Sequence, residues 1–467
     1  MTSTHVRSAP SRLVLPPGFE FGAATAAYQI EGAFDVDGRG PSIWDTYSHT
    51  PGKTFNGDTG DVAVEHYTRY PQDVALMKDL GLDTYRFSVS WPRILPAGKG
   101  AVEQRGLDFY RRLVDTILEA GIAPWLTLYH WDLPQALEDE DGWANRDTAK
   151  HFADYAGIVY DALGDRVPHW STLNEPMCSS LLGYNADAHA PGRTDPAAAA
   201  KAVHHLLLGH GLATQALRAK GADHLGITLN FTPMYAASDS EVDVDAARRQ
   251  DGQMNRMFIT PIVTGEYPAD VVEDLARVGA PLPVQDGDLE VIATPIDWLG
   301  INYYYAAVVS GGHEPQLPTT FIGCEDVREE AQDGPTTTMG WSLNPDSFTE
   351  LLGRITEIAP GLPLYITENG SAWPDEVAED GVVHDQQRVD YLHSHLAAMA
   401  TAIEAGADVR GYFAWSLLDN YEWARGYAQR FGIVHVDYDT QVRTPKDSAH
   451  AYAEVIGAHK RQHEAGA

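Results

Sequence analysis

Short runs rich in β-branched and aromatic residues alternate along the chain with longer segments whose apolar residues recur at helical spacing. We predict a strand in each of eight runs: Phe19 to Ala26, Thr84 to Trp91, Ala123 to His130, His169 to Pro176, Leu225 to Thr232, Trp298 to Tyr304, Leu362 to Glu368, and Gly411 to Leu417. The helices predicted between them are Val74 to Leu80, Phe109 to Ala120, Ala149 to Leu163, Ala197 to Ala219, Phe348 to Ile358 and Gln386 to Ala405. Strands that alternate with helices pair in parallel. No Pro/Ser-rich linker divides the chain, so the α/β pattern predicts a single closed (β/α)8 TIM barrel rather than a doubly wound sheet.

The barrel is predicted to form one catalytic domain over residues 18–460, with residues 1–17 as a flexible N-terminal extension. Two segments, 238–245 and 311–335, are polar or interrupted by Gly and Pro, so we predict loops there. Long loops of a barrel gather at its C-terminal face, where they shape a pocket. Glycines that directly follow predicted helices are expected to end them in a left-handed conformation. These are Gly81, Gly121, Gly164, Gly221 and Gly406.

Composition narrows the class of protein. The 467 residues include 33 Lys and Arg against 66 Asp and Glu, a net charge of −33, which disfavours nucleic acid as a partner. Hydrophobic residues make up 44%, which is typical of a globular chain. Cys178 and Cys324 lie too far apart to suggest a disulfide framework or a zinc ribbon. No run approaches the roughly 18 apolar residues of a membrane span, and the N-terminus lacks a secretory signal. We therefore predict a cytoplasmic protein with no membrane partner.

Polar and aromatic residues gather where the predicted strands end, and these ends meet at one face of a barrel. Each residue alone is compatible with ordinary packing, but packing needs only apolar volume, so together they predict a ligand site. In strand order they are Tyr28, Gln29 and Glu31; Arg86; His130, Trp131 and Asp132; Asn174 and Glu175; Asn230; Asn302 and Tyr304; Glu368 and Asn369; and Trp415, Glu422 and Trp423.

Two of these carboxylates, Glu175 and Glu368, end the fourth and seventh strands and so face each other across an eight-stranded barrel. Paired carboxyls are what glycoside cleavage requires, and tryptophan faces suit a pyranose ring. No H-x-H pair ends the first strand, no Lys ends any strand and no Gly-rich phosphate loop stands out, so other barrel chemistries are disfavoured. We predict no metal and no organic cofactor, because the two carboxylates suffice.

Seven segments together resemble glycoside hydrolase family 1, the retaining β-glycosidases, from Phe19 to about Ile456. They are FEFGAATAAYQIEGA (Phe19 to Ala33), YRFSVSWPRILP (Tyr85 to Pro96), YHWDLPQAL (Tyr129 to Leu137), TLNEP (Thr172 to Pro176), GINYY (Gly300 to Tyr304), YITENG (Tyr365 to Gly370) and GYFAWSLLDNYEWARGY (Gly411 to Tyr427). Any one segment could arise by chance, but seven in order make the resemblance specific.

The resemblance implies that Glu175 is the general acid/base and Glu368 the nucleophile. Arg86, Asn302 and Tyr304 are expected to support them, with the two carboxyls about 5 to 5.5 Å apart. Sugar binding is expected from Gln29, His130, Trp131, Asn174, Trp415, Glu422 and Trp423.

Two positions bear on the substrate. Met177 stands where the family usually has a tryptophan on the leaving-group side, so the aglycone preference is left open. The loop with Asp419 and Glu422 has no Lys, unlike the 6-phospho-β-glycosidase branch, so an unphosphorylated glycone is expected.

The predicted activity is hydrolysis of terminal non-reducing β-D-glucosyl residues, with possible β-galactosyl and β-fucosyl substrates, from cello-oligosaccharides or aryl and alkyl glucosides. A transglycosylase would use the same residues and remains an alternative. A non-catalytic sugar-binding barrel is disfavoured, since it needs neither Glu175 nor Glu368. The expected partner is a small β-glycoside, and a homo-oligomer is left open.

Overall fold

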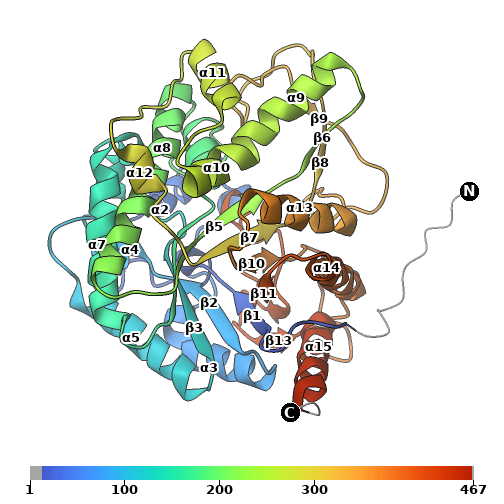
Figure 1. Cartoon of the computed structure of the whole chain (residues 1–467). Coiled ribbons are helices and arrows are strands. Elements are labelled where there is room, and N and C mark those ends of the chain that lie inside the picture. The colour runs from blue at the N-terminus through green and yellow to red at the C-terminus, as the bar shows by residue number, and fades with distance from the viewer. Residues whose placement is uncertain (1–12, 465–467) are drawn as a thin grey trace, which may run out of the picture.

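Eight parallel strands close into a barrel in the computed structural model, which describes residues 13–464 (Figure 1). The order around the barrel is β1-β2-β3-β4-β5-β7-β10-β11, and β11 pairs with β1. The strands are β1 (Glu20–Ala24), β2 (Thr84–Ser88), β3 (Ala123–Tyr129), β4 (His169–Asn174), β5 (Leu225–Phe231), β7 (Trp298–Tyr303), β10 (Leu364–Asn369) and β11 (Val409–Trp415). Six lie within the predicted runs; β10 ends one residue after its run and β11 begins two residues before its run. The barrel prediction is confirmed.

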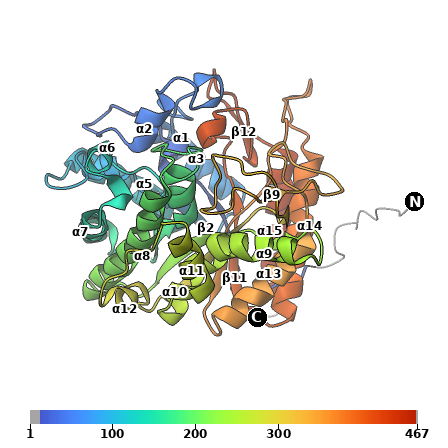
Figure 2. The same ribbon diagram turned by 90° about the horizontal axis from the view of Figure 1, so that it is seen from above.

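Helices form the outer layer around these strands (Figures 1 and 2). The long ones are α3 (His66–Asp79), α5 (Gln104–Glu119), α7 (Asp147–Leu163), α8 (Pro196–Ala219), α13 (Pro345–Ile358), α14 (Gln386–Glu404) and α15 (Asp447–Glu464). Helix α5 shows why such segments are helical: Leu107, Tyr110, Val114 and Ile117 recur on one face and are buried. The predicted helices are confirmed, although α3 begins at His66 rather than Val74.

Shorter elements lie in the connections. The helices are α1 (Ala27–Ile30), α2 (Ile43–Ser48), α4 (Trp91–Ile94), α6 (Gln135–Glu138), α9 (Glu241–Asp251), α10 (Met257–Thr264), α11 (Ala269–Arg277) and α12 (Asp288–Ile292). A three-stranded sheet comprises β6 (Met234–Ala236), β8 (Ala307–Ser310) and β9 (Arg328–Glu329), and β12 (Val434–Val436) pairs with β13 (Arg443–Pro445). The connections after β5 and β7 are the longest, and they rise from the C-terminal ends of those strands.

The predicted loop over 238–245 is wrong in its second half, where α9 begins at Glu241. The Ser240 hydroxyl caps this helix by accepting a hydrogen bond from the Asp243 N–H at 3.2 Å. The helix is largely exposed and polar, so it lacks the apolar periodicity by which a helix is recognised.

Four of the five helix-ending glycines have the expected left-handed backbone: Gly81 (φ 76°), Gly121 (81°), Gly221 (97°) and Gly406 (112°). Gly164 is the exception, with φ −65°, because its N–H still donates to the Tyr160 carbonyl and continues the helix.

Aromatic side chains fill the barrel beneath the strand ends. The ring of Trp125 on β3 lies 4.9 Å from Trp298, 4.7 Å from Tyr365 and 5.0 Å from Phe413, measured between centroids. All four are buried. The interior is therefore a packed core rather than a channel, which leaves the C-terminal ends as the place where a pocket can open.

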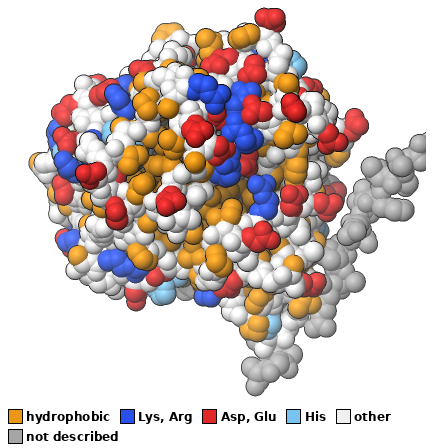
Figure 3. All heavy atoms as spheres, turned by 45° about the horizontal axis from the view of Figure 1, so that its top comes forward, with side chains coloured by type: hydrophobic (Ala, Val, Ile, Leu, Met, Phe, Trp, Pro, Cys, Tyr) orange, Lys and Arg blue, Asp and Glu red, His pale blue; other side chains and the backbone are white. Residues whose placement is uncertain are grey.

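The face shown in Figure 3 carries charged side chains of both signs among hydrophobic and other side chains, and several lysines and arginines lie together near its upper middle. Among the described residues, no helix is both long and apolar enough to cross a membrane. The first 12 residues of the predicted N-terminal extension lie outside the described part of the chain.

A buried ion cluster ties the loop after β11 to the starts of α14 and α15. Lys446 donates to Asp419 at 2.7 Å and to Asp375 at 2.5 Å. Arg430 binds Asp419 at 2.7 Å, and Arg388 binds Asp375 at 2.6 Å. Since the loop after β11 carries Glu422 and Trp423, the cluster fixes one wall of the site.

We expect Asp419→Asn to destabilise the fold by about 3 to 5 kcal/mol, because it leaves the buried Lys446 without one of its two carboxylate partners. Thermal unfolding measures the loss. The control is Asp408→Asn, whose pair with Arg410 is about half exposed and should shift the melting temperature far less. Equal shifts for the two variants would contradict a structural role for the cluster.

Candidate active site

The C-terminal ends of the strands surround a cavity of about 290 Å³. Most of the predicted site residues line it: His130, Trp131, Glu175, Met177, Asn302, Tyr304, Glu368, Trp415, Glu422 and Trp423. Gln29, Arg86 and Asn174, which the family resemblance also placed there, do not line the cavity but donate or accept hydrogen bonds with residues that do. Of the other strand-end residues, Asn230 lines the cavity, whereas Tyr28, Glu31, Asp132 and Asn369 do not. Residues from all eight barrel strands and the segments that follow them thus converge on one site.

A continuous set of hydrogen bonds joins the two carboxyls. Arg86 donates one N–H to Glu368 Oε1 and another to Asn174 Oδ1, both at 2.6 Å. Asn302 Nδ2 donates to Asn174 Oδ1 at 3.1 Å and to Glu175 Oε1 at 2.7 Å. Each bond is buried, so the guanidinium and the two amides fix the carboxyls relative to each other.

Neighbouring side chains fix the orientation of this network. The Thr367 hydroxyl donates to Asn302 Oδ1 at 2.7 Å, so Nδ2 is the atom that faces Glu175. The Tyr304 hydroxyl donates to the second oxygen of Glu368 at 2.6 Å. Both oxygens of Glu368 therefore have a donor, one charged and one neutral.

The two carboxyls differ in charge because their neighbours differ. Burial, followed by the negative charge of Glu368, raises the pKa of Glu175 to about 8. Burial also raises the pKa of Glu368, but the Arg86 charge and the Tyr304 hydroxyl oppose that effect. Glu368 is accordingly the carboxyl that ionises first, and Glu175 keeps its proton at neutral pH.

Three site residues adopt a left-handed backbone that is uncommon outside glycine: Trp131 (φ 76°), Glu175 (48°) and Trp423 (52°). Each such conformation costs about 1 to 2 kcal/mol for an L-residue. The left-handed conformation changes the direction in which each of these side chains points. Trp131 and Glu175 lie just past a strand end, and Trp423 lies in the loop after β11. Tertiary contacts hold the strained geometry, as where Trp131 Nε1 donates to the Asn174 carbonyl at 3.0 Å.

One half of the cavity offers polar atoms. Gln29 Nε2 lies 3.4 Å from Glu422 Oε2, while Gln29 Oε1 and His130 Nδ1 are buried without a protein partner. Burial, with the Arg86 charge, lowers the pKa of His130 well below its usual value, so its ring is neutral. Such groups suit sugar hydroxyls, which both donate and accept hydrogen bonds.

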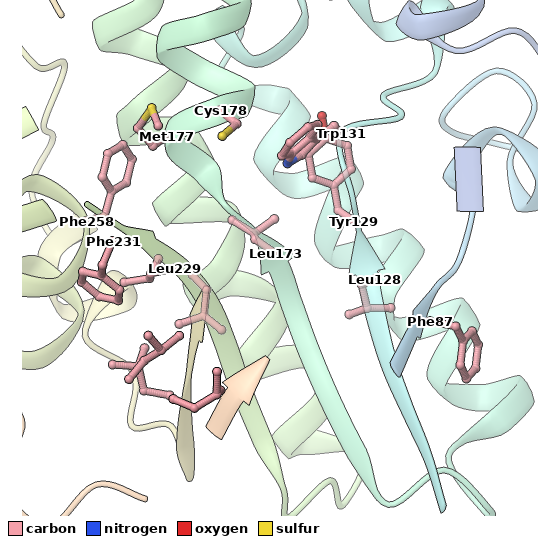
Figure 4. Close-up of a cluster of buried hydrophobic side chains, with 14 of the residues drawn as sticks. Phe87, Leu128, Tyr129, Trp131, Leu173, Met177, Cys178, Leu229, Phe231 and Phe258 are labelled. Atoms are coloured by element: carbon pink, nitrogen blue, oxygen red, sulfur yellow. The ribbon is translucent and has the colours of Figure 1, made fainter. Parts of the chain in front are cut away.

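Cys178 is a site residue that sequence reasoning missed. Its thiol donates to Glu175 Oε2 at 3.3 Å and is buried. Its distance from Cys324 in the sequence argued only against a disulfide framework or a zinc ribbon, although its place three residues after Glu175, just past a strand end, was a usable signal. Figure 4 shows Cys178 and Met177 together beyond the end of β4.

The opposite half of the cavity was also largely missed, because its residues come from connections outside the barrel strands. Its apolar lining comprises Met177, Leu182, Phe231, Met234, Met254, Tyr305, Phe321, Met339 and Trp341. Only Met177 was predicted to lie there. No group of three or more His, Cys, Asp or Glu side chains among residues 13–464 is arranged to hold a metal ion.

Comparison with known proteins agrees with this geometry. The family model for Glycosyl hydrolase family 1 matches residues 11–461. A bifunctional β-D-glucosidase/β-D-fucosidase of Bifidobacterium breve is 49% identical over 460 residues, which cover 96% of this chain and 99% of the relative. The psychrophilic β-glucosidase of Micrococcus antarcticus superposes with a TM-score of 0.93 at 51% identity, covering 98% of this chain and all of the other. A Thermotoga maritima family 1 β-glucosidase in complex with isofagomine lactam gives a TM-score of 0.90 at 46% identity, covering 95% and 99%.

A closed (β/α)8 barrel with two opposed carboxyls in one sugar-sized pocket defines the class of glycoside hydrolases. The chain belongs to glycosyl hydrolase family 1, and it is an enzyme of the β-glycosidase class.

We expect the Glu175 carboxyl to titrate near pH 8 in the free enzyme, as followed by carbon-detected NMR of labelled glutamate. Glu368→Gln should lower that pKa by about one unit or more, since it removes the negative charge that opposes ionisation. Cys178→Ala should raise it, since the ionised carboxylate loses a hydrogen bond.

Cys324→Ala is the matched control for Cys178→Ala, because Cys324 is also buried but does not line the cavity. It should leave the Glu175 titration where it was. Titration of Glu175 near its ordinary value of about 4.3 would contradict the geometry described.

Proposed function

We propose that the enzyme is a retaining β-glucosidase that removes terminal non-reducing β-D-glucosyl residues. The observation that carries the proposal is the difference between the two carboxyls: Glu368 is bound by Arg86 and Tyr304, whereas Glu175 remains protonated beside it. This is the pairing of an ionised nucleophile with a neutral acid that glycoside cleavage by double displacement requires.

In the first step the Glu368 carboxylate attacks the anomeric carbon, and Glu175 gives its proton to the glycosidic oxygen. The bond from the anomeric carbon to that oxygen breaks, the aglycone leaves as an alcohol, and an ester joins the sugar to Glu368. The negative charge that Glu368 loses had raised the pKa of Glu175, so Glu175 becomes a stable carboxylate once its proton has gone.

In the second step the Glu175 carboxylate takes a proton from water, whose oxygen attacks the anomeric carbon. The ester bond breaks, Glu368 leaves as a carboxylate, and Glu175 is again protonated. Each step inverts the configuration at the anomeric carbon, so the two steps together retain it. Arg86 and Tyr304 stabilise Glu368 as the leaving carboxylate, with the hydrogen bonds that they make to it in the free enzyme.

The polar half of the cavity is proposed to bind the glycone. Gln29, His130 and Glu422 accept and donate hydrogen bonds with the ring hydroxyls, and Trp415 offers an apolar face. Trp131, Asn174 and Trp423 complete this half. Flexible hydrogen-bonding groups separate sugar epimers poorly, so β-galactosides and β-fucosides are proposed as further substrates. The Bifidobacterium breve relative, which is named for both β-glucosidase and β-fucosidase activity, supports this breadth.

Cello-oligosaccharides and aryl or alkyl glucosides are the proposed leaving-group classes. Transfer of the sugar to an acceptor other than water uses the same ester intermediate and is expected when acceptors are in excess. The cytoplasmic location remains a prediction, and the oligomeric state is left open.

Glu175→Ala should slow hydrolysis of an alkyl β-glucoside by about 10²- to 10⁴-fold, and Glu368→Ala should abolish it. The wild-type rate should fall as pH rises through about 8, because Glu175 then loses the proton that it must donate. Proton NMR of the wild-type reaction should show β-glucose as the first product.

Glu404→Ala, on the exposed surface of α14, is the control and should retain wild-type turnover. If α-glucose were formed first, the enzyme would be inverting and the nucleophile assignment would be wrong.

An unphosphorylated glucoside should be hydrolysed far faster than the corresponding 6-phosphoglucoside. The cavity lining includes no Lys or Arg, so no cationic side chain is available to bind a sugar phosphate, and the ionised Glu368 repels it. Comparing kcat/KM for 4-nitrophenyl β-glucoside and its 6-phosphate tests this. A preference for the phosphorylated substrate would refute the proposed glycone site.

A further inference from the structure

The two oxygens of the Glu175 carboxyl have different partners. Oε1 accepts a hydrogen bond from Asn302 Nδ2 at 2.7 Å, and the Thr367 hydroxyl holds the Asn302 amide in that orientation. Oε1 therefore faces an N–H whether the carboxyl is neutral or ionised. The proton of neutral Glu175 accordingly lies on Oε2, because the unprotonated oxygen is the better acceptor for that N–H.

Cys178 is the partner of Oε2. Its Sγ lies 3.3 Å from Oε2, and both residues are buried. The backbone fixes the pair, because Cys178 begins the helical turn Cys178–Leu182 and its N–H donates to the Glu175 carbonyl at 3.0 Å. In the described part of the chain, Oε2 has no other hydrogen-bond partner. The thiol is thus placed to decide where Oε2 directs its proton.

Asn230 orients the thiol. Its Nδ2, on β5, donates to Cys178 Sγ at 3.7 Å. With an N–H directed at the sulfur, the thiol hydrogen is left for Glu175 Oε2, the acceptor within its reach. Hydrogen bonds therefore run in one direction, from Asn230 through Cys178 to Glu175.

The thiol keeps its hydrogen throughout. Burial, followed by the negative charge of Glu175, raises the pKa of the Cys178 thiol well above its ordinary value, and the charges of Glu368 and Glu422 add to this effect. A thiol is also a weak donor, so it occupies Oε2 without strongly stabilising the carboxylate. An acid needs such a partner, since a strong donor would lower its pKa and remove the proton at neutral pH.

We propose that Cys178 is a positioning residue for the acid/base Glu175, and that Asn230 orients its thiol. The S–H occupies one side of Oε2, so the carboxyl hydrogen points away from the sulfur, into the cavity that the glycosidic oxygen enters. This step rests on the proposed function, in which Glu175 gives its proton to that oxygen. Because the thiol does not exchange its own proton, Glu175 returns to the same geometry after each turnover.

Two substrates with different needs for acid catalysis test the proposal. The 2,4-dinitrophenolate of an aryl β-glucoside leaves without a proton, whereas hexyl β-glucoside needs one because an alkoxide is a poor leaving group. Cys178→Ala should lower kcat/KM for hexyl β-glucoside about tenfold, and it should leave that for 2,4-dinitrophenyl β-glucoside within about twofold. Equal losses on the two substrates would indicate general damage to the site and would overturn the proposal.

Two further variants separate the hydrogen bond from packing. Cys178→Ser keeps a donor at the same position and should recover most of the rate on hexyl β-glucoside, so a Ser variant no better than Ala would refute the hydrogen-bonding role. Cys324→Ala is the matched control. Cys324 is buried and accepts a long hydrogen bond from Gln253 at 3.9 Å, but it does not line the cavity. It should change neither rate, and a loss confined to the hexyl substrate would contradict a local effect of Cys178.

A double-mutant cycle tests the role of Asn230. Asn230→Leu frees the thiol to rotate and should lower the ratio of the two kcat/KM values, hexyl over dinitrophenyl, by about threefold. In the Cys178→Ala background the same change should not lower the ratio further, because no thiol remains to be oriented. Losses that multiply would show that Asn230 acts independently of Cys178.

Infrared spectroscopy gives a readout that needs no turnover. The chain has two cysteines, so in Cys324→Ala the S–H stretching band reports Cys178 alone. The band should shift to lower frequency as pH rises through about 8, because the ionised Glu175 is the stronger acceptor, and Glu175→Gln should abolish the shift. A band that does not move with pH would overturn only the positioning role. Failure of the wild type to hydrolyse either glucoside would instead overturn the proposed function.

Discussion

The site depends on two carboxyls being buried in one cavity without sharing the same charge. Burial disfavours ionisation of both Glu175 and Glu368, and each negative charge would oppose the other. Arg86 resolves the conflict by binding Glu368 directly and by orienting Asn174 and, through it, Asn302 against Glu175. The network therefore assigns the charge to one carboxyl and the proton to the other.

The barrel supplies the rigid frame that this arrangement requires. Its interior is filled by aromatic side chains, and a buried ion cluster around Lys446 anchors the loop that follows β11. With the frame fixed, the chain can hold Trp131, Glu175 and Trp423 in an unfavourable backbone conformation. Strained backbone is common at sites where side-chain direction matters more than local stability.

The two halves of the cavity come from different parts of the fold. The polar half is built from the segments after β11, β1 and β3, whose motifs are strong in the sequence. The apolar half comes largely from connections after β5 and β7, where Met254 and Met339 lie in segments with no recognisable motif. The apolar lining thus depends largely on connecting segments, while the two opposed carboxyls depend on the barrel strands.

The sequence by itself predicted the barrel, which the structure confirms, and most of the polar residues that line its cavity, because alternating periodicity and strand-end polarity are local signals. It did not predict helix α9, whose exposed face lacks apolar periodicity, nor the right-handed backbone of Gly164. Only the tertiary structure decided which carboxyl is bound by Arg86 and Tyr304, that Cys178 contacts Glu175, and that four methionines far apart in the chain line the same cavity. Charge state and pocket shape arise from burial and contact between segments far apart in the chain, and no local pattern encodes those distances.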